Sequence, residues 1–180
     1  EEKLRMRDPL PEPVAIELEH RPVSYEFDLF QQGDRHLREL PLEKLTYVVF
    51  DTETTGLNPS EGDEIIQLGA IRIVNGRLLY HEAIDQLVDP LREVPPASVE
   101  IHGIQPELLP GQPTIDKVLP HFHRFAENSV LVAHNAAFDM RFLQLKEESA
   151  GVKFDNPVLD TLLLSSIIHP HQDSHSLEGL

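Results

Sequence analysis

The chain has 180 residues, of which 40% are hydrophobic, so it can bury one core with a small appendage. Its formal net charge of -16 argues against a broad basic surface, so a nucleic acid would be held at a local site with the help of metal ions. The absence of cysteine excludes disulfides and thiolate metal sites and is compatible with a cytoplasmic protein, and no apolar run approaches the roughly 20 residues that span a bilayer.

Residues 1–44 are expected to form an irregular N-terminal arm, separate from a domain over residues 45–180. Five prolines interrupt any long helix in this arm. Its apolar side chains can dock on the domain or on a partner such as a polymerase or a repair protein; they are Val23, Tyr25, Phe27, Leu29 and Phe30. A helical turn is expected over residues 35–40.

From residue 45 the pattern predicts three consecutive antiparallel strands, over residues 45–52, 64–74 and 77–88. The dipeptide Asn75-Gly76 between the last two strands is typical of a two-residue hairpin turn. The second strand is so apolar that both of its faces are expected to be largely covered.

The remaining chain alternates helices and strands. Helices are expected over residues 97–101, 114–127, 136–149 and 161–168, with a further one beginning at 176, and strands over 129–133 and 157–159. Asn135 is the expected N-cap of the third helix. Asp139 then lies in the first helical turn, where the helix dipole favours a carboxylate, and His134 is expected to orient that turn.

The stretch VFDTETTGL, residues 49–57, brings two carboxylates to the end of the first predicted strand. Asp51 and Glu53 are two positions apart, so on an extended strand both lie on one face. Oxygen ligands that converge in this way suit a hard divalent cation, and Asp139 supplies a third. The Thr-Thr-Gly triplet after Glu53 lets backbone amides approach a phosphate. The plain alternative is that Asp51 begins a turn and Glu53 is solvated.

Five motifs in this order resemble the DEDD superfamily of 3′ to 5′ exonucleases, and within it the branch that contains the proofreading epsilon subunit of bacterial DNA polymerase III. They are VFDTETTGL at 49–57, EIIQLGAI at 64–71, HGI at 102–104, AHNAAFDMRFL at 133–143 and VLDTLLL at 158–164. The resemblance covers residues 45–180. It implies an α/β, ribonuclease H-like fold, in which helices flank a mixed sheet of three antiparallel and two parallel strands.

The resemblance also implies the chemistry. Two divalent cations, Mg²⁺ or Mn²⁺, are clamped by four carboxylates, and a histidine deprotonates the attacking water. Asp51, Glu53 and Asp139 match three of these carboxylates, as catalytic residues and metal ligands. The expected reaction releases nucleoside 5′-monophosphates from single-stranded or frayed 3′ ends of DNA.

Four substrate contacts follow from the same resemblance. Thr54 offers its backbone to the terminal nucleotide and Leu57 packs against its base. His102 and Phe138 line the terminal pocket. The alternative for Leu57 and Phe138 is core packing, and the alternative for His102 is a histidine bonded to the backbone of a turn.

The family's last motif, a histidine followed five residues later by an aspartate, has no match in this chain. Residues 175–180 match the segment that leads toward that motif. The general base and the fourth metal ligand are therefore expected beyond Leu180, and hydrolysis by the 180-residue chain is expected to be impaired. His175 matches a position ahead of the motif and is not a substitute.

Three other possibilities stay open. The group His169, His171, Asp173 and His175 could chelate zinc, although a solvated loop explains it more simply. The acidic pocket could belong to a non-catalytic nucleotide-binding or scaffold module of a polymerase or repair complex. An exoribonuclease on short RNA is the third, because discrimination of the 2′-hydroxyl depends on the shape of the pocket.

Overall fold

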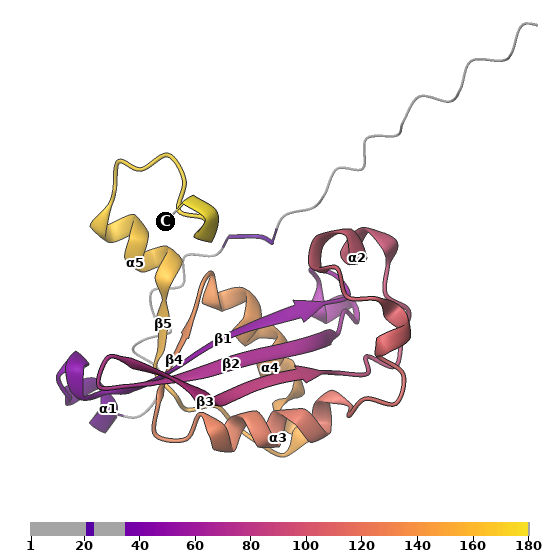
Figure 1. Cartoon of the computed structure of the whole chain (residues 1–180), viewed down its shortest axis with the longest axis horizontal. Helices are drawn as coiled ribbons and strands as arrows, with labels where there is room; N and C mark the ends of the chain where they lie inside the picture. The colour runs from indigo at the N-terminus through magenta and orange to yellow at the C-terminus, as the bar shows by residue number, and fades with distance from the viewer. Residues whose placement is uncertain (1–20, 24–34, 180) are drawn as a thin grey trace, which may run out of the picture.

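The computed structural model of the chain describes residues 21–23 and 35–179, and its centre is a mixed five-stranded sheet (Figure 1). The strands are β1 Thr46–Thr54, β2 Ile65–Val74, β3 Arg77–Leu87, β4 Val130–Ala133 and β5 Val158–Asp160. Their order in the sheet is β3-β2-β1-β4-β5. The first three strands are antiparallel, whereas β4 pairs parallel to β1 and β5 parallel to β4. The predicted ribonuclease H-like sheet is therefore confirmed.

Five α-helices and four short 3-10 helices lie in the described part of the chain. They are α1 Arg35–Glu39, η2 Leu42–Lys44, η3 Pro59–Glu61, α2 Pro96–His102, η4 Pro106–Leu108, α3 Ile115–Phe125, α4 Ala136–Ala150, α5 Thr161–Ile168 and η5 Leu177–Gly179. The bounds of α5 are those predicted. Where a longer helix was expected to begin, at residue 176, the structure has the single turn η5.

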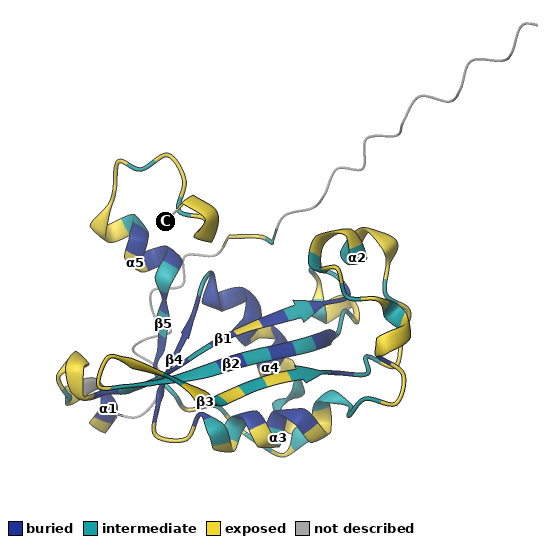
Figure 2. Cartoon of the chain, in the orientation of Figure 1, coloured by how far each residue is buried: buried dark blue, intermediate teal, exposed yellow. Residues whose placement is uncertain are grey.

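The side chains of β1 alternate between two environments. Val48 and Phe50 point into a core that α3 and α4 cover from one side of the sheet (Figures 1 and 2). The rings of Phe50 and Phe122, from α3, have centroids 5.3 Å apart. Because strand side chains alternate, Asp51 and Glu53 lie together on the opposite face, as the spacing predicts.

The hairpin between β2 and β3 turns at Asn75 and Gly76, with φ angles of 51° and 71°. Both residues are in the left-handed region that a type I′ turn requires, which confirms the predicted turn. This turn fixes the register in which β2 pairs with β3.

A small second apolar cluster lies at the other end of β1. Leu37 from α1 is buried there with Leu45 and Val130. Of the apolar arm residues expected to dock, Val23 is 53% exposed, and the rest lie outside the described residues. Within the described ranges, no helix combines the length and apolar character needed to cross a membrane.

Candidate active site

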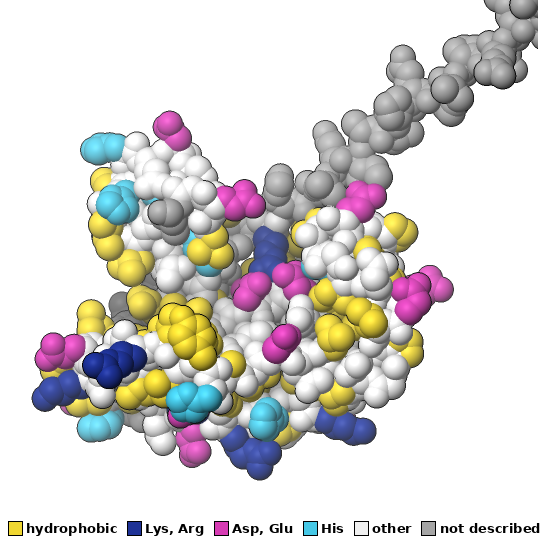
Figure 3. Space-filling view, viewed as in Figure 1, with side chains coloured by type: hydrophobic (Ala, Val, Ile, Leu, Met, Phe, Trp, Pro, Cys, Tyr) yellow, Lys and Arg dark blue, Asp and Glu magenta, His cyan; other side chains and the backbone are white. Residues whose placement is uncertain are grey.

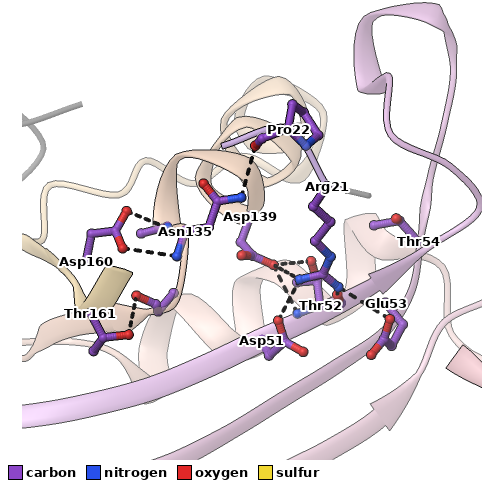
Figure 4. Close-up of polar contacts among 12 residues, drawn as sticks. Arg21, Pro22, Asp51, Thr52, Glu53, Thr54, Asn135, Asp139, Asp160 and Thr161 are labelled. Atoms are coloured by element: carbon purple, nitrogen blue, oxygen red, sulfur yellow. Dashed lines mark hydrogen bonds and ion pairs between the residues drawn. The ribbon is translucent and has the colours of Figure 1, made fainter. Parts of the chain in front are cut away.

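Three acidic side chains surround one point beside the C-terminal end of β1 (Figure 4). Asp51 and Glu53 project from β1, and Asp139 projects from the first turn of α4. Their side-chain exposure is 62% for Asp51, 31% for Glu53 and 0% for Asp139. Asp139 therefore lies at the buried bottom of the site, whereas Asp51 faces solvent.

The guanidinium of Arg21 links these carboxylates. Its Nη1 lies 2.9 Å from Oδ1 of Asp51 and 3.8 Å from Oδ1 of Asp139, and its Nη2 lies 3.3 Å from Oε2 of Glu53. Nη2 also donates to the carbonyl of Thr52. Across the described residues, no three His, Asp or Glu side chains gather closely enough to hold a metal ion directly. The cation at the centre of the three carboxylates is the guanidinium.

The two oxygens of Asp139 have different surroundings. Oδ1 accepts hydrogen bonds from the backbone N–H of Thr52 at 3.1 Å and from its hydroxyl at 2.5 Å. The parallel pairing of β1 with β4 covers only residues 47–49, so Thr52 lies past the end of that ladder. Oδ2 is buried and has no hydrogen-bond partner among the described residues. One oxygen fixes the carboxylate in place, and the other remains for a ligand.

Burial is the largest single influence on the pKa values of Arg21, Glu53 and Asp139 in this site. It raises the pKa of Asp139 to about 7, although hydrogen bonds from Thr52 and the charge of Arg21 act in the opposite direction. Burial likewise raises the pKa of Glu53 against the charge of Arg21. Burial alone lowers the pKa of Arg21, but the charges of Asp139 and Asp51 outweigh it and the pKa is raised. One guanidinium does not fully offset the buried negative charge.

The junction between β4 and α4, which positions Asp139, is held by a residue that the sequence did not single out. Asp160, at the end of β5, is 5% exposed, and its Oδ1 accepts from the N–H of Asn135 at 3.0 Å and of Leu162 at 2.9 Å. Its Oδ2 accepts from the N–H of Ala136 at 2.9 Å. Asp160 thus joins the starts of α4 and α5 to one carboxylate.

Asn135 stands at the predicted N-cap position of α4, but it does not cap the helix with its side chain. Its φ of 59° is left-handed, and its Nδ2 donates to the carbonyl of Pro22 at 3.0 Å. His134 lies with Nδ1 2.9 Å from Oγ1 of Thr161, so it ties β4 to α5. Asp160, rather than His134, holds the turn that carries Asp139.

A cavity of about 460 Å³ opens on the sheet face that carries Asp51. Its lining comes from β1, β2, β4, the β4–α4 turn, α5 and η5, as residues Val49, Phe50, Asp51, Gly69, Ala70, Ile71, Val132, Ala133, His134, Thr161 and Leu177. Gly69 pairs with Asp51 across the β1–β2 ladder, and a Cβ built on it would meet no atom within 4 Å. The sheet therefore leaves open space beside Asp51. Figure 3 shows a group of acidic side chains on this face of the molecule, between the α5 and α2 regions.

The loop after β1 is closely braced at the predicted nucleotide contacts. The Thr54 hydroxyl donates to the carbonyl of Gly56 at 2.7 Å. Asp63 accepts from the hydroxyl of Thr55 and from the N–H of Asn58, each at 3.0 Å. A Cβ at Gly56 would lie 2.6 Å from Cγ of Asp63, so only glycine lets the chain pass this close. The bracing holds the backbone of the Thr-Thr-Gly triplet at the end of β1.

His102 has the geometry of a backbone-bonded turn histidine. Its Nδ1 accepts from the N–H of Ile104 at 3.0 Å, and burial lowers its pKa. In a neutral imidazole whose Nδ1 accepts, Nε2 carries the proton. Nε2 is buried without a partner in the described part of the chain, so His102 keeps an unused hydrogen-bond donor.

Leu57 and Phe138 both contact the main core. Leu57 packs against it while partly buried, and Phe138 is 6% exposed with its ring 5.2 Å from that of Phe142. The guanidinium carbon of Arg21 lies 4.8 Å from the centroid of the Phe138 ring. Both side chains therefore pack with the core, and Phe138 also borders the acidic site through Arg21.

The histidines near the end of the chain do not form the zinc group considered above. Nδ1 of His175 lies 2.8 Å from Oγ of Ser165, which ties the last segment to α5. His169, His171 and Asp173 lie in the described part of the chain, where no three such side chains stand close enough in this arrangement to share a metal. The solvated-loop interpretation fits these positions.

Residues 48–180 match the profile of a family described as Exonuclease (RNase_T). The chain is 52% identical over 173 residues to a DNA polymerase III subunit epsilon-like protein of Rhodobacter capsulatus, a match that covers 96% of the chain and 24% of that relative. It is 44% identical over 124 residues to a PolC-type DNA polymerase III of Clostridium perfringens, covering 69% of the chain and 8% of that protein. The chain thus spans a quarter or less of these relatives.

Solved structures share the fold. Exonuclease X in complex with 5′-overhanging duplex DNA superposes with a TM-score of 0.58 at 26% identity, covering 74% of this chain and 70% of that one. The zinc-bound complex of Escherichia coli exonuclease I with single-stranded DNA has a TM-score of 0.64 at 19% identity, covering 75% and 34%. Together with a family profile that spans most of the chain and a relative at 52% identity, the five-stranded sheet and its buried carboxylate lead to one assignment: the chain belongs to the RNase_T exonuclease family.

Proposed function

We propose that the chain is a metal-dependent 3′ to 5′ exonuclease domain that releases nucleoside 5′-monophosphates from single-stranded or frayed DNA ends. The observation that carries the proposal is the unpartnered, buried Oδ2 of Asp139 beside the carboxylates of Asp51 and Glu53. A buried carboxylate oxygen without a donor is unfavourable unless a ligand completes it.

The residues present fit a hard divalent cation. All three side chains offer only oxygen, which Mg²⁺ and Mn²⁺ prefer, and two of them come from one face of β1. The side chains need to close around the cation, because Arg21 separates them at present. Asp51, the most exposed of the three, has the freedom to make this movement.

Bound cations would lower the pKa of a coordinated water and offset charge on the leaving 3′ oxygen. The chain's own residues would determine where the cations lie. Asp139 is fixed by Thr52 and Asp51 reaches solvent, so together they hold the cation at the mouth of the site. Glu53, half-buried and two residues along β1, provides a further carboxylate from the same side.

The terminal nucleotide is proposed to lie between the end of β1 and α2. Ser98 of α2 donates to the carbonyl of Thr55 at 2.7 Å, so the helix and the braced loop are joined along one side of this place. Thr54 offers backbone groups and Leu57 an apolar edge to the base. The free Nε2–H of His102 can donate to an oxygen of the nucleotide, and Phe138 borders the pocket beside Asp139.

DNA is the proposed substrate because the relatives include DNA polymerase III proteins and an exonuclease solved with duplex DNA. Their association with polymerases also supports a polymerase or repair protein as partner, with the N-terminal arm as the contact. The 31 acidic side chains outnumber the 15 Lys and Arg side chains, which gives the net charge of -16, so attraction of the phosphates is proposed to come mainly from the bound cations.

A nuclease assay tests the proposal. A single-stranded DNA labelled at its 5′ end is incubated with the chain and Mn²⁺ or Mg²⁺, and the products are separated by length. We expect slow stepwise shortening from the 3′ end, because the family's last motif has no match in this chain. We also expect release of nucleoside 5′-monophosphates and complete dependence on the cation. Asp51→Asn should reduce the rate at least about 100-fold, whereas Asp155→Asn, at a 73% exposed side chain, should not change it.

The same assay separates the alternatives. Faster shortening of an RNA of equal sequence would identify an exoribonuclease. Binding of a nucleoside monophosphate without any shortening would favour the non-catalytic module. Shortening from the 5′ end, or a rate unchanged by Asp51→Asn, would contradict the proposed site.

A further inference from the structure

Arg21 occupies the place between the three carboxylates that the proposed cations require. It approaches Oδ1 of Asp51 and of Asp139 with Nη1, and Oε2 of Glu53 with Nη2 (Figure 4). Its own side chain is 30% exposed, so the guanidinium is largely removed from water. The contacts join residues that are 30 and 32 positions apart in the sequence, so they are tertiary and not local.

Two further contacts hold this segment in the site. The guanidinium carbon lies 4.8 Å from the centroid of the Phe138 ring, which is a favourable cation–π distance. The carbonyl of Pro22 accepts from Nδ2 of Asn135 at 3.0 Å, at the start of α4. The Arg-Pro pair therefore covers both the acidic cluster and the aromatic side chain proposed to border the nucleotide.

We propose that Arg21 is an intramolecular competitor of the divalent cations, so that the segment 21–23 closes the active site when cations are scarce and leaves it when they bind. The inference rests on the proposed function, because it takes Asp51, Glu53 and Asp139 as the cation ligands.

The competition follows from charge and geometry. A guanidinium forms forked hydrogen bonds to carboxylates and is more weakly hydrated than an ammonium ion, so it suits this half-buried position. It carries one positive charge, whereas a divalent cation carries two and needs the same oxygens at about 2.0–2.4 Å. Both cannot occupy the site, since the guanidinium would lie within a few ångströms of a like charge.

The strength of the effect depends on how often the segment is in place. A ligand that binds only the open form has its apparent affinity reduced by the open fraction. If about nine molecules in ten are closed, the apparent Kd for the cation rises about tenfold. The segment belongs to the same chain, so dilution of the protein does not relieve this competition.

Calorimetric titration with Mn²⁺ tests the inference without any substrate. Arg21→Ala removes the competitor and should lower the apparent Kd about tenfold. Arg21→Lys keeps the positive charge but loses the forked hydrogen-bond donors of the guanidinium, so it should give an apparent Kd between those of the unchanged chain and Arg21→Ala. Arg77→Ala is the matched control, because it removes an equal charge from an exposed position at the start of β3 and should change the Kd less than about twofold.

A second readout follows the segment itself. The chain has no cysteine, so Val23→Cys at a 53% exposed side chain creates a unique site for a nitroxide spin label. Saturating Mg²⁺ should increase the mobility of the label in the otherwise unchanged chain. With Arg21→Ala added, the label should already be mobile and should not respond to Mg²⁺.

The outcomes distinguish the two proposals. Mn²⁺ binding with the same Kd in the unchanged chain and in Arg21→Ala would overturn the competition and leave the cation site intact. Failure of every variant to bind Mn²⁺ would overturn both proposals. If circular dichroism shows that Arg21→Ala does not fold, the labelled chain decides: a label that stays immobile while Mg²⁺ binds would refute release of the segment.

Discussion

Asp139 is central to the site because its two carboxylate oxygens differ in their hydrogen bonding. Thr52 donates twice to Oδ1, and Oδ2 is buried without a partner in the described part of the chain. Asp51 and Glu53 are more exposed and can adjust to a ligand. In the proposed function, the buried carboxylate would set where a cation is held, and the more exposed ones would close over it.

Removal of the most exposed carboxylate should weaken cation binding and leave folding intact. We expect Asp51→Asn to raise the apparent Kd for Mn²⁺ at least about tenfold, because one of three oxygen donors loses its charge. The Asp51 side chain is 62% exposed and therefore remains hydrated in its ion pair with Arg21, so the thermal midpoint without metal should shift by less than about 3 °C. Calorimetry and thermal unfolding measure both quantities, and Asp155→Asn serves as the control.

Asp139 should make the stability of the cation-free chain depend on pH. Burial raises its pKa from 3.8 to about 7 in the folded chain, so between these values the folded chain holds a proton that the unfolded chain has lost. The stabilisation from this group is fully present below about pH 4 and is lost as the pH rises through about 7. Asn does not titrate, so Asp139→Asn should lack this loss.

Urea unfolding between about pH 5.5 and 8 stays above the isoelectric point of about 4.9 and measures this effect. Over that range, the free energy of unfolding of the unchanged chain should fall by about 2 kcal/mol relative to Asp139→Asn. Parallel pH profiles for the two chains would show that the carboxyl group is not protonated in the folded chain at these pH values.

At the scale of elements, the junctions after β4 and β5 position the site. Parallel pairing sets Asp160 beside Ala133, and the carboxylate of Asp160 then reaches the first N–H groups of the β4–α4 turn. It also caps α5 through the N–H of Leu162. The place of Asp139 thus depends on a residue of a different strand.

Asp160→Asn replaces one of the accepting oxygens by a donor, so a buried N–H loses its partner. We expect the free energy of unfolding to fall by about 2–3 kcal/mol, seen as a lower midpoint in urea. Asp155→Asn, which changes an exposed aspartate five residues away, should change the free energy of unfolding by less than about 0.5 kcal/mol and leave the midpoint in urea nearly unchanged. Equal midpoints for both variants would mean that the junction holds without Asp160.

The elements themselves were largely predictable because their signals are local. The apolar run before Asp51 predicts β1 and the shared face of its two acids, and Asn75-Gly76 predicts the hairpin. An aspartate directly before a helical run also indicates that Asp160 caps α5. Its reach to Asn135 depends on the β4–β5 pairing, which the local sequence does not reveal.

The contact of Arg21 with the acids was not predictable from the sequence. Arg21 is one of several basic residues in a proline-containing stretch, and nothing around it marks a binding site. The contact exists only because β1 and α4 bring acids from two distant segments to one point. Positions fixed by sheet topology alone carry no local signal.

In the whole molecule, β1 is the central strand and joins an antiparallel half of the sheet to a parallel half. Asp51 and Glu53 come from this strand, and Asp139 follows the first strand of the parallel half. The site therefore exists only when β1 and β4 lie side by side. Acidic side chains outnumber Arg21 in the site, and the chain carries a net charge of -16, so the proposed role of divalent cations includes offsetting this charge when a phosphate approaches.

Anomalous X-ray scattering from crystals of this chain grown with Mn²⁺ tests the cation site most directly. The predicted result is an anomalous peak within about 2.0–2.4 Å of oxygens of Asp51 and Asp139, with the guanidinium of Arg21 withdrawn from both. An anomalous map without a peak at these residues under saturating Mn²⁺, with Arg21 still on the carboxylates, would contradict the proposed metal-dependent site.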